Sequence, residues 1–451
     1  MNLKSVKSWL ILALCASSIV NFFLQSESVR LLSAALTLIV FALALPGARR
    51  FTGVLSLIMF ISALFIHLRT GGGLYATAEI IVANLPLITL IIAVPLLSVP
   101  WKEEGYFSSV QTLIRRWHAN SRRIFAGISG FIFIFGPVLN LGILRLVHDM
   151  VKDLKLSERL LARAYLTGFS AIVIWSPFFA STAYVLYLLD VPIADYVPIG
   201  LPFAILQLVI GNLLFWFAAK KLARSRRELP PEAVPALSAA DRNNILYLIL
   251  MLSVIIVSIF AIEIFTRYPI MIIVVMVSVL FPFAWGAVRN KWRRLRAQLA
   301  EYKSNSVTSM DNEIIMLVSA GMFGASLSGT PLSAGIQEVF VSVSSFSFPL
   351  FGAGIILIIM ILGAAGLHPI AVVAVLASQM SPELIGARPE TLALFIMIGW
   401  SAVAVISPVM ALNVLVSQYL NRSSYEVGIG SNALYLACLV GIGTLYASLF
   451  C

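Results

Sequence analysis

The chain has 451 residues, of which 60% are hydrophobic and only 11% are charged. A soluble domain carries about 25% charged residues, whereas the apolar residues here form runs of about 20, the length of a membrane span. The composition therefore excludes a soluble fold, and the lack of short alternating segments excludes a transmembrane β-barrel. The sequence predicts an all-α polytopic membrane protein.

The net charge of +11 comes mainly from basic residues in short loops between apolar runs. Such residues orient a membrane protein, so no nucleic-acid partner is expected. Only three cysteines occur, which argues against a disulfide framework. No phosphate-binding loop of the form GxxxxGK[ST] is present and no span carries spaced arginines, so the sequence does not support ATP hydrolysis or voltage sensing.

Eleven apolar runs have the length of a membrane span. In chain order they cover 9–25, 30–46, 51–69, 75–97, 164–189, 198–218, 244–262, 268–286, 312–328, 391–419 and 430–450. The first run resembles a signal peptide, but no small-residue cleavage site follows it. Residues 1–29 are therefore expected to form an uncleaved first span.

Two further apolar stretches, about 124–150 and 346–380, are interrupted by FGPVLN and GLHP. We expect each to turn at its Gly/Pro centre and return to its own side as a re-entrant hairpin, which is tolerated where the backbone is buried or lines a wet cavity. With the N-terminus in the cytoplasm, 26 of the 31 Lys and Arg then lie on the inner side and four on the outer side. This bias supports the topology and places the C-terminus outside the cell membrane.

A polar cytoplasmic linker, 219–243, divides the chain into two similar halves. GFSAIVIWSP at 168–177 recurs as GWSAVAVISP at 399–408, with five of ten residues identical. Pro137 falls near Pro369 at a similar offset, and EIIVANLPL at Glu79 parallels EIIMLVSAG at Glu313. Because the spans 75–97 and 312–328 cross in opposite directions, the halves 30–218 and 244–450 are predicted to be inverted repeats.

Each repeat places Ser-Pro inside a span, where proline interrupts the helical hydrogen bonds. Freed amides and half-helix N-termini favour anions, and freed carbonyls suit a cation such as Na⁺. The candidate solute- and ion-binding residues are those at the breaks, the polar groups after them and the hairpin turns: Pro137, Asn140, Ser176, Pro177, Ser181, Thr182, His368, Pro369, Ser407, Pro408, Asn413 and Ser417. For each Ser or Thr the alternative is a bond to a carbonyl one turn earlier.

No Asp or Glu falls in the middle of a predicted span, which leaves His368 as the strongest titratable candidate. In a functional role it would bind an anion or carry a coupling proton. The alternative is a neutral side chain that donates one hydrogen bond within its hairpin. No metal site and no cofactor other than Na⁺ as a coupling ion are predicted.

This arrangement resembles the ion transporter superfamily, which includes the divalent anion/sodium symporters and the arsenite-pump-like permeases. The resemblance covers about 30–450. The symporters carry Ser-Asn-Thr motifs at their hairpin tips, whereas the matching places here read GPVLN and GLHP, with Asn140 as the single loose counterpart. That departure leaves the substrate and the sodium dependence open. The resemblance implies a homodimer in which a transport domain (124–218 with 346–450) moves against a scaffold (30–97 with 244–328) as an elevator.

The leading hypothesis is a secondary active transporter in the cell inner membrane that moves a small anionic solute, coupled to Na⁺ or H⁺, with membrane lipid around it. One alternative is a cation/proton antiporter or metalloid permease on the same architecture. Another, from a different class, is a membrane-embedded lipid-handling enzyme, which would need clustered acidic, His or Arg residues near one interface.

Overall fold

The structure is a computed structural model that describes residues 3–103, 107–117, 120–222 and 237–450. The described residues form helices joined by short loops, with no strand among them. Within them, eleven helical segments are long and apolar enough to cross a membrane, and a bent pair counts as a twelfth if it is taken as one span. The chain is therefore an all-α polytopic membrane protein. Most of the expected linker, 223–236, lies outside the described residues.

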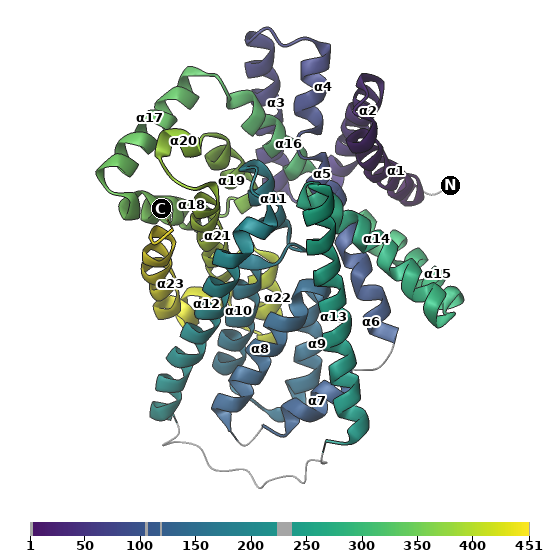
Figure 1. The fold of residues 1–451 in the computed structure, drawn as a ribbon, viewed down its shortest axis with the longest axis vertical. Helices are drawn as coiled ribbons and strands as arrows, with labels where there is room; N and C mark the ends of the chain where they lie inside the picture. Colours follow the sequence, from purple (N-terminus) through teal and green to yellow (C-terminus); the bar gives the residue numbers. More distant parts are fainter. Residues whose placement is uncertain (1–2, 104–106, 118–119, 223–236, 451) are drawn as a thin grey trace.

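Six α-helices form the N-terminal part of the described chain (Figure 1). They are α1 (Leu3–Leu24), α2 (Glu27–Ala44), α3 (Arg50–Arg69), α4 (Leu74–Val82), α5 (Leu85–Ala93) and α6 (Val99–Glu103). α16 (Asp311–Leu327) packs against α2, α3, α4 and α5. A kink at Asn84 separates α4 from α5. The Asn84 Nδ2 atom ties this kink to α16 by donating to Leu317 O at 2.9 Å.

A second group of helices packs around α10 and α21, which cross each other. Its first part is α7 (Phe107–Arg115), α8 (Ser121–Leu139), α9 (Gly142–Val151), α10 (Glu158–Trp175), α11 (Ala180–Leu188) and α12 (Ile193–Leu222). Its second part is α18 (Phe348–Ala364), α19 (Pro369–Ser378), α20 (Pro382–Ile385), α21 (Pro389–Ile406), α22 (Ala411–Leu420), η7 (Glu426–Gly430) and α23 (Ser431–Ser448).

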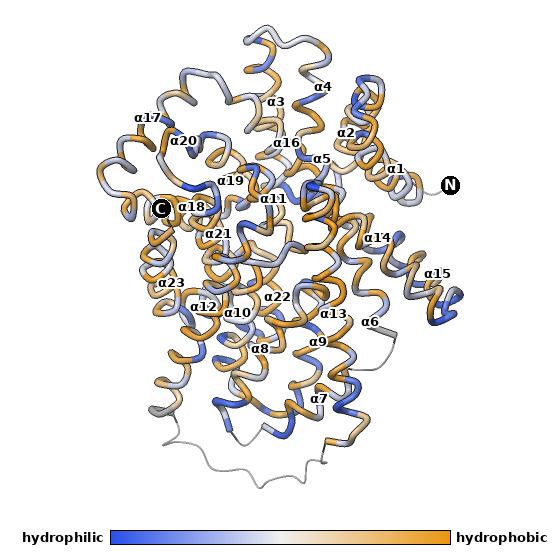
Figure 2. Tube along the Cα trace, in the orientation of Figure 1, coloured by the Kyte–Doolittle hydropathy of each residue, from blue (hydrophilic) through white to orange (hydrophobic). Residues whose placement is uncertain are grey.

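Three helices connect these groups. They are α13 (Ala239–Thr266), α14 (Ile270–Arg289) and the basic α15 (Trp292–Glu301). α14 packs on α5, and α13 contacts α12 and α7. Figure 2 shows apolar residues along the long helices, with hydrophilic residues at the ends of α7 and α15. This is the pattern of helices that bury their length in lipid or protein and expose their ends to water.

The predicted interruptions at 124–150 and 346–380 are both helix–turn–helix pairs, but the turns differ from the expectation in detail. Pro137 lies inside α8 rather than ending it, and the chain turns at Asn140, whose φ is 48°. The second pair turns around Gly366, with φ of 96°, and Pro369 begins α19. A single proline costs a helix one hydrogen bond but permits it to continue when the freed carbonyl is accommodated.

Two segments also differ from their predicted form: α8, predicted as part of a re-entrant hairpin, and α16, predicted as a full span. At 19 residues, α8 is itself long enough to be a candidate span, whereas α16, from the predicted span 312–328, has 17 residues and continues after an 83° bend into α17 (Pro331–Phe346). The bend follows Gly329, whose φ of 75° favours glycine. The sequence analysis missed α17, because its apolar residues occupy only part of its circumference.

Candidate functional site

The first predicted break is present between α10 and α11. Ser176 leaves the helical conformation with φ −81° and ψ 120°, and α11 resumes at Ala180. Pro177 has no N–H to donate to Val173 O, four residues earlier. The Thr182 hydroxyl from α11 donates to that carbonyl at 2.8 Å, and Tyr196 OH from α12 donates to Ile174 O at 2.8 Å. Side chains therefore replace the helical partners that the break removes.

The second break, between α21 and α22, is built in the same way. Ser407 is extended with φ −74° and ψ 125°, and α22 resumes at Ala411. The Asn413 Nδ2 atom donates to Val405 O at 3.0 Å. Asn413 and Thr182 occupy matching positions at the offset of 231 that relates the two Ser-Pro pairs. Gly428 of η7 closes over this break, because a Cβ there would lie 2.7 Å from Val405 O.

Polar atoms without partners gather at both breaks. The Oγ atoms of Ser176, Ser181 and Ser407 and the Oδ1 atom of Asn413 are buried with no hydrogen-bond partner in the described chain. Ser176, Ser407 and Asn413 are 0% exposed. A buried polar atom without a partner costs about 1–3 kcal/mol. Four such atoms, of which those of Ser176 and Ser407 match at the offset of 231, indicate places where a ligand, ion or water completes the hydrogen bonding.

The two hairpins pack on the helices that lead into the breaks. A Cβ at Gly136 of α8 would lie 2.2 Å from Ile172 Cδ1, and a Cβ at Gly363 of α18 would lie 2.5 Å from Val403 Cγ1. Each glycine therefore lets its hairpin approach the last turns before a break. Ile172 and Val403 are again matched at the offset of 231.

The polar side chains at the hairpin turns have local backbone partners. The Asn140 Oδ1 atom accepts from Leu141 N at 2.7 Å. His368 caps α19, since its Nδ1 atom accepts from Ile370 N at 3.3 Å. This bond leaves the Nε2 atom as the proton-bearing side of a neutral ring. Both residues are half-buried.

The remaining predicted residues fall into two sets. Pro177 and Pro408 lie in the breaks, Pro137 and Pro369 lie at the hairpins, and Ser181 is the second residue of α11, next to Thr182. Ser417 does not join them, because it lies in the second half of α22 and its Oγ atom is 3.1 Å from Ser424 Oγ in the following loop.

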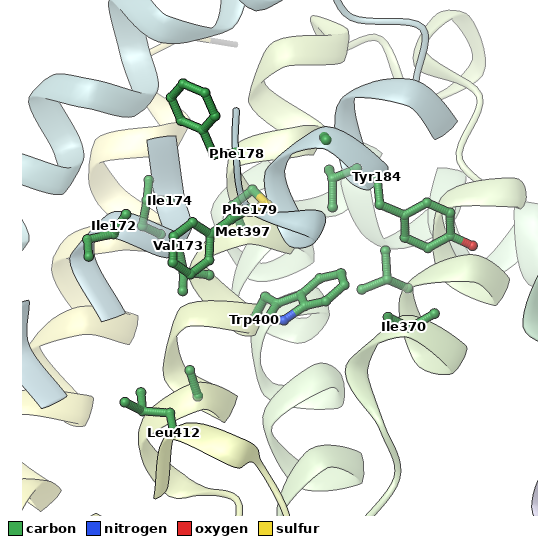
Figure 3. Close-up of a cluster of buried hydrophobic side chains, with 14 of the residues drawn as sticks. Ile172, Val173, Ile174, Phe178, Phe179, Tyr184, Ile370, Met397, Trp400 and Leu412 are labelled. Atoms are coloured by element: carbon green, nitrogen blue, oxygen red, sulfur yellow. The ribbon is translucent and has the colours of Figure 1, made fainter. Parts of the chain in front are cut away.

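The surroundings of the breaks are apolar and aromatic. Figure 3 shows a buried cluster that includes Phe178 and Phe179 from the first break, Met397 and Trp400 from α21, and Ile370 from α19. The second hairpin therefore contributes to the same cluster as the first break. Among the described residues no group of three or more His, Cys, Asp and Glu side chains could hold a metal ion. A solute here would meet hydrogen-bonding groups on an apolar background.

A polar cluster that the sequence analysis missed lies where α10 and α21 cross. The Gln207 Nε2 atom lies 2.7 Å from Tyr435 OH, 2.9 Å from Ser401 Oγ and 3.0 Å from Ser170 Oγ. Ser401 Oγ donates to Ser170 O at 2.9 Å. Ser170 and Ser401 were recognised only as repeat matches. Gln207, an isolated amide in an apolar span, was the available signal.

We expect Gln207→Leu to lower the free energy of unfolding by about 1–2 kcal/mol, because it leaves buried hydroxyls of the cluster with fewer partners. Thermal denaturation in detergent measures the effect. Gln337→Leu, on α17, is the control, because no side-chain hydrogen bond of Gln337 is found within the described residues, and it should unfold like the wild type. Equal stability of the two variants would contradict a structural role for the cluster.

Comparison with known proteins supports the fold. No known family and no curated protein matches the sequence. Among solved structures, the YdaH transporter of Alcanivorax borkumensis aligns at a TM-score of 0.54 and 15% identity, over 81% of this chain and 84% of that chain. MtrF of Neisseria gonorrhoeae, described within a class of antimetabolite efflux pumps, aligns at a TM-score of 0.54 and 18% identity, over 84% of this chain and 83% of that chain. The chain thus shares its fold with two membrane proteins, one described as a transporter and the other as an efflux pump.

Proposed function

We propose that the protein is a secondary active transporter that moves a small, anionic solute across the cell inner membrane, coupled to Na⁺ or H⁺. The observation that carries the proposal is the pair of broken helices with unpartnered buried polar atoms at matched positions. Interrupted helices of this kind supply amides and carbonyls for solute and ion in secondary transporters. The two structural neighbours, a transporter and a member of a class of efflux pumps, also favour transport.

The two halves would be inverted repeats with re-entrant hairpins, as in the ion transporter superfamily. Support comes from matched contacts rather than from sequence identity alone. Thr182 and Asn413 each bridge a break, and Gly136 and Gly363 each seat a hairpin on the helix before a break. Unrelated segments would have no reason to repeat both contacts at nearly one offset.

The N-terminus would be cytoplasmic and the C-terminus outside. The orientation rests on the charge bias. Polar contacts between segment ends agree with the grouping of these ends into two sides. On the inner side Lys7 pairs with Asp311, and Arg422 donates to Glu158 at 2.6 Å. On the outer side Glu263 accepts from Ile193 N at 2.8 Å, and Thr391 donates to Phe450 O at 2.9 Å.

An elevator movement would carry α8–α12 and α18–α23 past α2–α5 and α13–α16 in each subunit of a homodimer. The contacts between these groups combine hydrogen bonds, such as the one that Glu263 of α13 accepts from Ile193 N of α12 at 2.8 Å, with close approaches of helices. Asn84 Nδ2 donates to Tyr184 OH of α11 at 3.0 Å, and Gly324 of α16 lets α19 approach, since a Cβ there would lie 3.1 Å from Ala374 O. Apolar and small-residue contacts of this kind exchange without leaving charges buried.

Uptake by proteoliposomes tests the proposal. We expect purified protein to move at least one member of a panel of small carboxylates and oxyanions, with a rate that depends on an imposed Na⁺ or H⁺ gradient. Asn140→Ala should reduce that rate at an unchanged protein level, because it removes the side chain that turns the first hairpin. Absence of gradient-dependent transport for every anion would reject the proposal.

Export is the second direction to measure. The description of MtrF as one of a class of antimetabolite efflux pumps favours an outward-moving solute. When an Na⁺ or H⁺ gradient is imposed, inside-out vesicles should accumulate an anion that the protein exports. Right-side-out vesicles should accumulate an anion that it imports. Gradient dissipation with no organic anion present would instead favour the cation/proton antiporter.

A further inference from the structure

A cavity of about 300 Å³ lies away from the breaks, near the C-terminal end of α1. It is bounded by α1, α2, α4, α5, α11 and α14, and its polar lining consists of Ser18, Asn21, Gln25, Arg30, Glu79 and Tyr187. Its volume falls at the lower end of the range of small-molecule sites. None of the residues that line it belongs to either break.

Two opposite charges face the cavity, Arg30 and Glu79, and they form a loose ion pair. Arg30 Nη1 lies 3.8 Å from Glu79 Oε1, which is beyond hydrogen-bond distance. The Arg30 side chain is 31% exposed and the Glu79 side chain is 70% exposed. Each group can therefore accept a ligand group of opposite charge while the other remains nearby.

An unpartnered acceptor lies on the same wall. The Asn21 Oδ1 atom is buried and has no hydrogen-bond partner in the described chain. Asn21 is in the last turn of α1, and Gln25, with φ of 46°, turns the chain there towards α2. A buried amide oxygen without a donor is costly, so this atom favours a ligand that brings an N–H.

The rest of the cavity wall is apolar. Phe22, Leu85 and Ile272 belong to it, and Leu85 and Ile272 are each 2% exposed. The Phe22 ring packs edge-on against Tyr268 with centroids 5.2 Å apart, which holds the wall in place. Such a surface accommodates a hydrocarbon group of the ligand.

We propose that this cavity binds a small zwitterion that carries an apolar group. Arg30 holds the anionic end, Glu79 and the Asn21 Oδ1 atom hold the ammonium, and the hydrocarbon lies against the apolar wall. Two sources have this chemistry: a free hydrophobic amino acid and the headgroup of an ethanolamine phospholipid. The inference does not depend on transport through the breaks, since it concerns a different cavity.

Thermal stabilisation of purified, delipidated protein tests the proposal, because a ligand stabilises the state it binds. The probes are leucine and dihexanoyl phosphatidylethanolamine for the two sources. Leucinamide lacks the anion and 4-methylpentanoate lacks the ammonium. We expect saturable stabilisation by at least one zwitterion, and weaker stabilisation by both single-charge probes. Stabilisation by leucine assigns a solute site, and stabilisation by the phospholipid alone assigns a lipid site.

Variants locate the binding. Arg30→Gln and Asn21→Leu should each weaken the effective zwitterion by about tenfold or more, the loss expected for a charge-assisted or buried hydrogen bond, and Arg30→Lys should retain part of the affinity. Arg69→Gln is the matched control, since Arg69 stacks on Phe65 of α3 and does not line the cavity. Equal binding by Arg30→Gln and the wild type, or no stabilisation by either zwitterion, would overturn the proposal.

Discussion

Asn413→Ala is expected to reduce solute transport by proteoliposomes at least about tenfold. The change removes the Nδ2 donor to Val405 O and also the unpartnered Oδ1 atom at the second break. Leaving Val405 O without a hydrogen-bond partner costs about 1–3 kcal/mol. Losing a ligand contact at the Oδ1 atom would weaken binding further. Initial rates at matched protein density in the bilayer give the measurement.

The equivalent change at the first break allows a closely matched control. Thr182→Val removes the hydroxyl donor to Val173 O, which has no amide donor because of Pro177. Thr37→Val removes a buried hydroxyl that donates to Ser33 O at 2.7 Å within the continuous helix α2, where the helical amide remains as partner. Transport should fall in Thr182→Val and persist in Thr37→Val. Equal rates in these two variants would show that the breaks have no special role.

Gly168→Val is expected to lower the free energy of unfolding by about 1–3 kcal/mol, the usual effect of overpacking. A Cβ at Gly168 would lie 2.6 Å from Ser129 O and 3.0 Å from Ser129 Cα, which are backbone atoms of α8. Backbone in a packed helix cannot rotate away, so α8 and α10 would have to separate. Thermal denaturation in detergent, followed by size-exclusion chromatography, measures the change.

A second glycine of α8 provides the control. Gly130 has nothing within 4 Å of the position of a Cβ, and alanine is favoured over glycine within a helix by about 1 kcal/mol. Gly130→Ala should therefore be as stable as the wild type or more so. If Gly168→Val denatures at the same temperature as Gly130→Ala, the close contact between α8 and α10 is wrong.

The sequence predicted the breaks well because their cause is local. Pro177 and Pro408 cannot donate a hydrogen bond wherever they lie, and the chain leaves the helical conformation at the serine before each. Pro137 was less informative. Its helix continues to Leu139, and the turn comes at Asn140 instead. Whether a proline ends a helix or only bends it depends on whether another donor or the surrounding packing accommodates the freed carbonyl. The neighbouring residues alone do not decide this.

The candidate site was predicted in part. Thr182 and Asn413 were predicted from their polarity alone. Only the structure shows that each donates a hydrogen bond to a backbone carbonyl freed at a break. The cluster around Gln207 was missed, because its members come from α10, α12, α21 and α23 and none shows a motif with the others. Long-range pairs of this kind leave no periodic signal in one sequence.

The sequence by itself determined the membrane class, the approximate spans and the two Ser-Pro interruptions with their similar flanking residues. These depend on hydrophobic length and on the covalent chemistry of proline, which act within one segment. Only the tertiary structure decided which polar atoms remain without partners, which glycines seat the hairpins and where the cavity beside Arg30 lies. Those features arise when helices distant in sequence pack together, so that burial and missing partners become properties of the assembled fold.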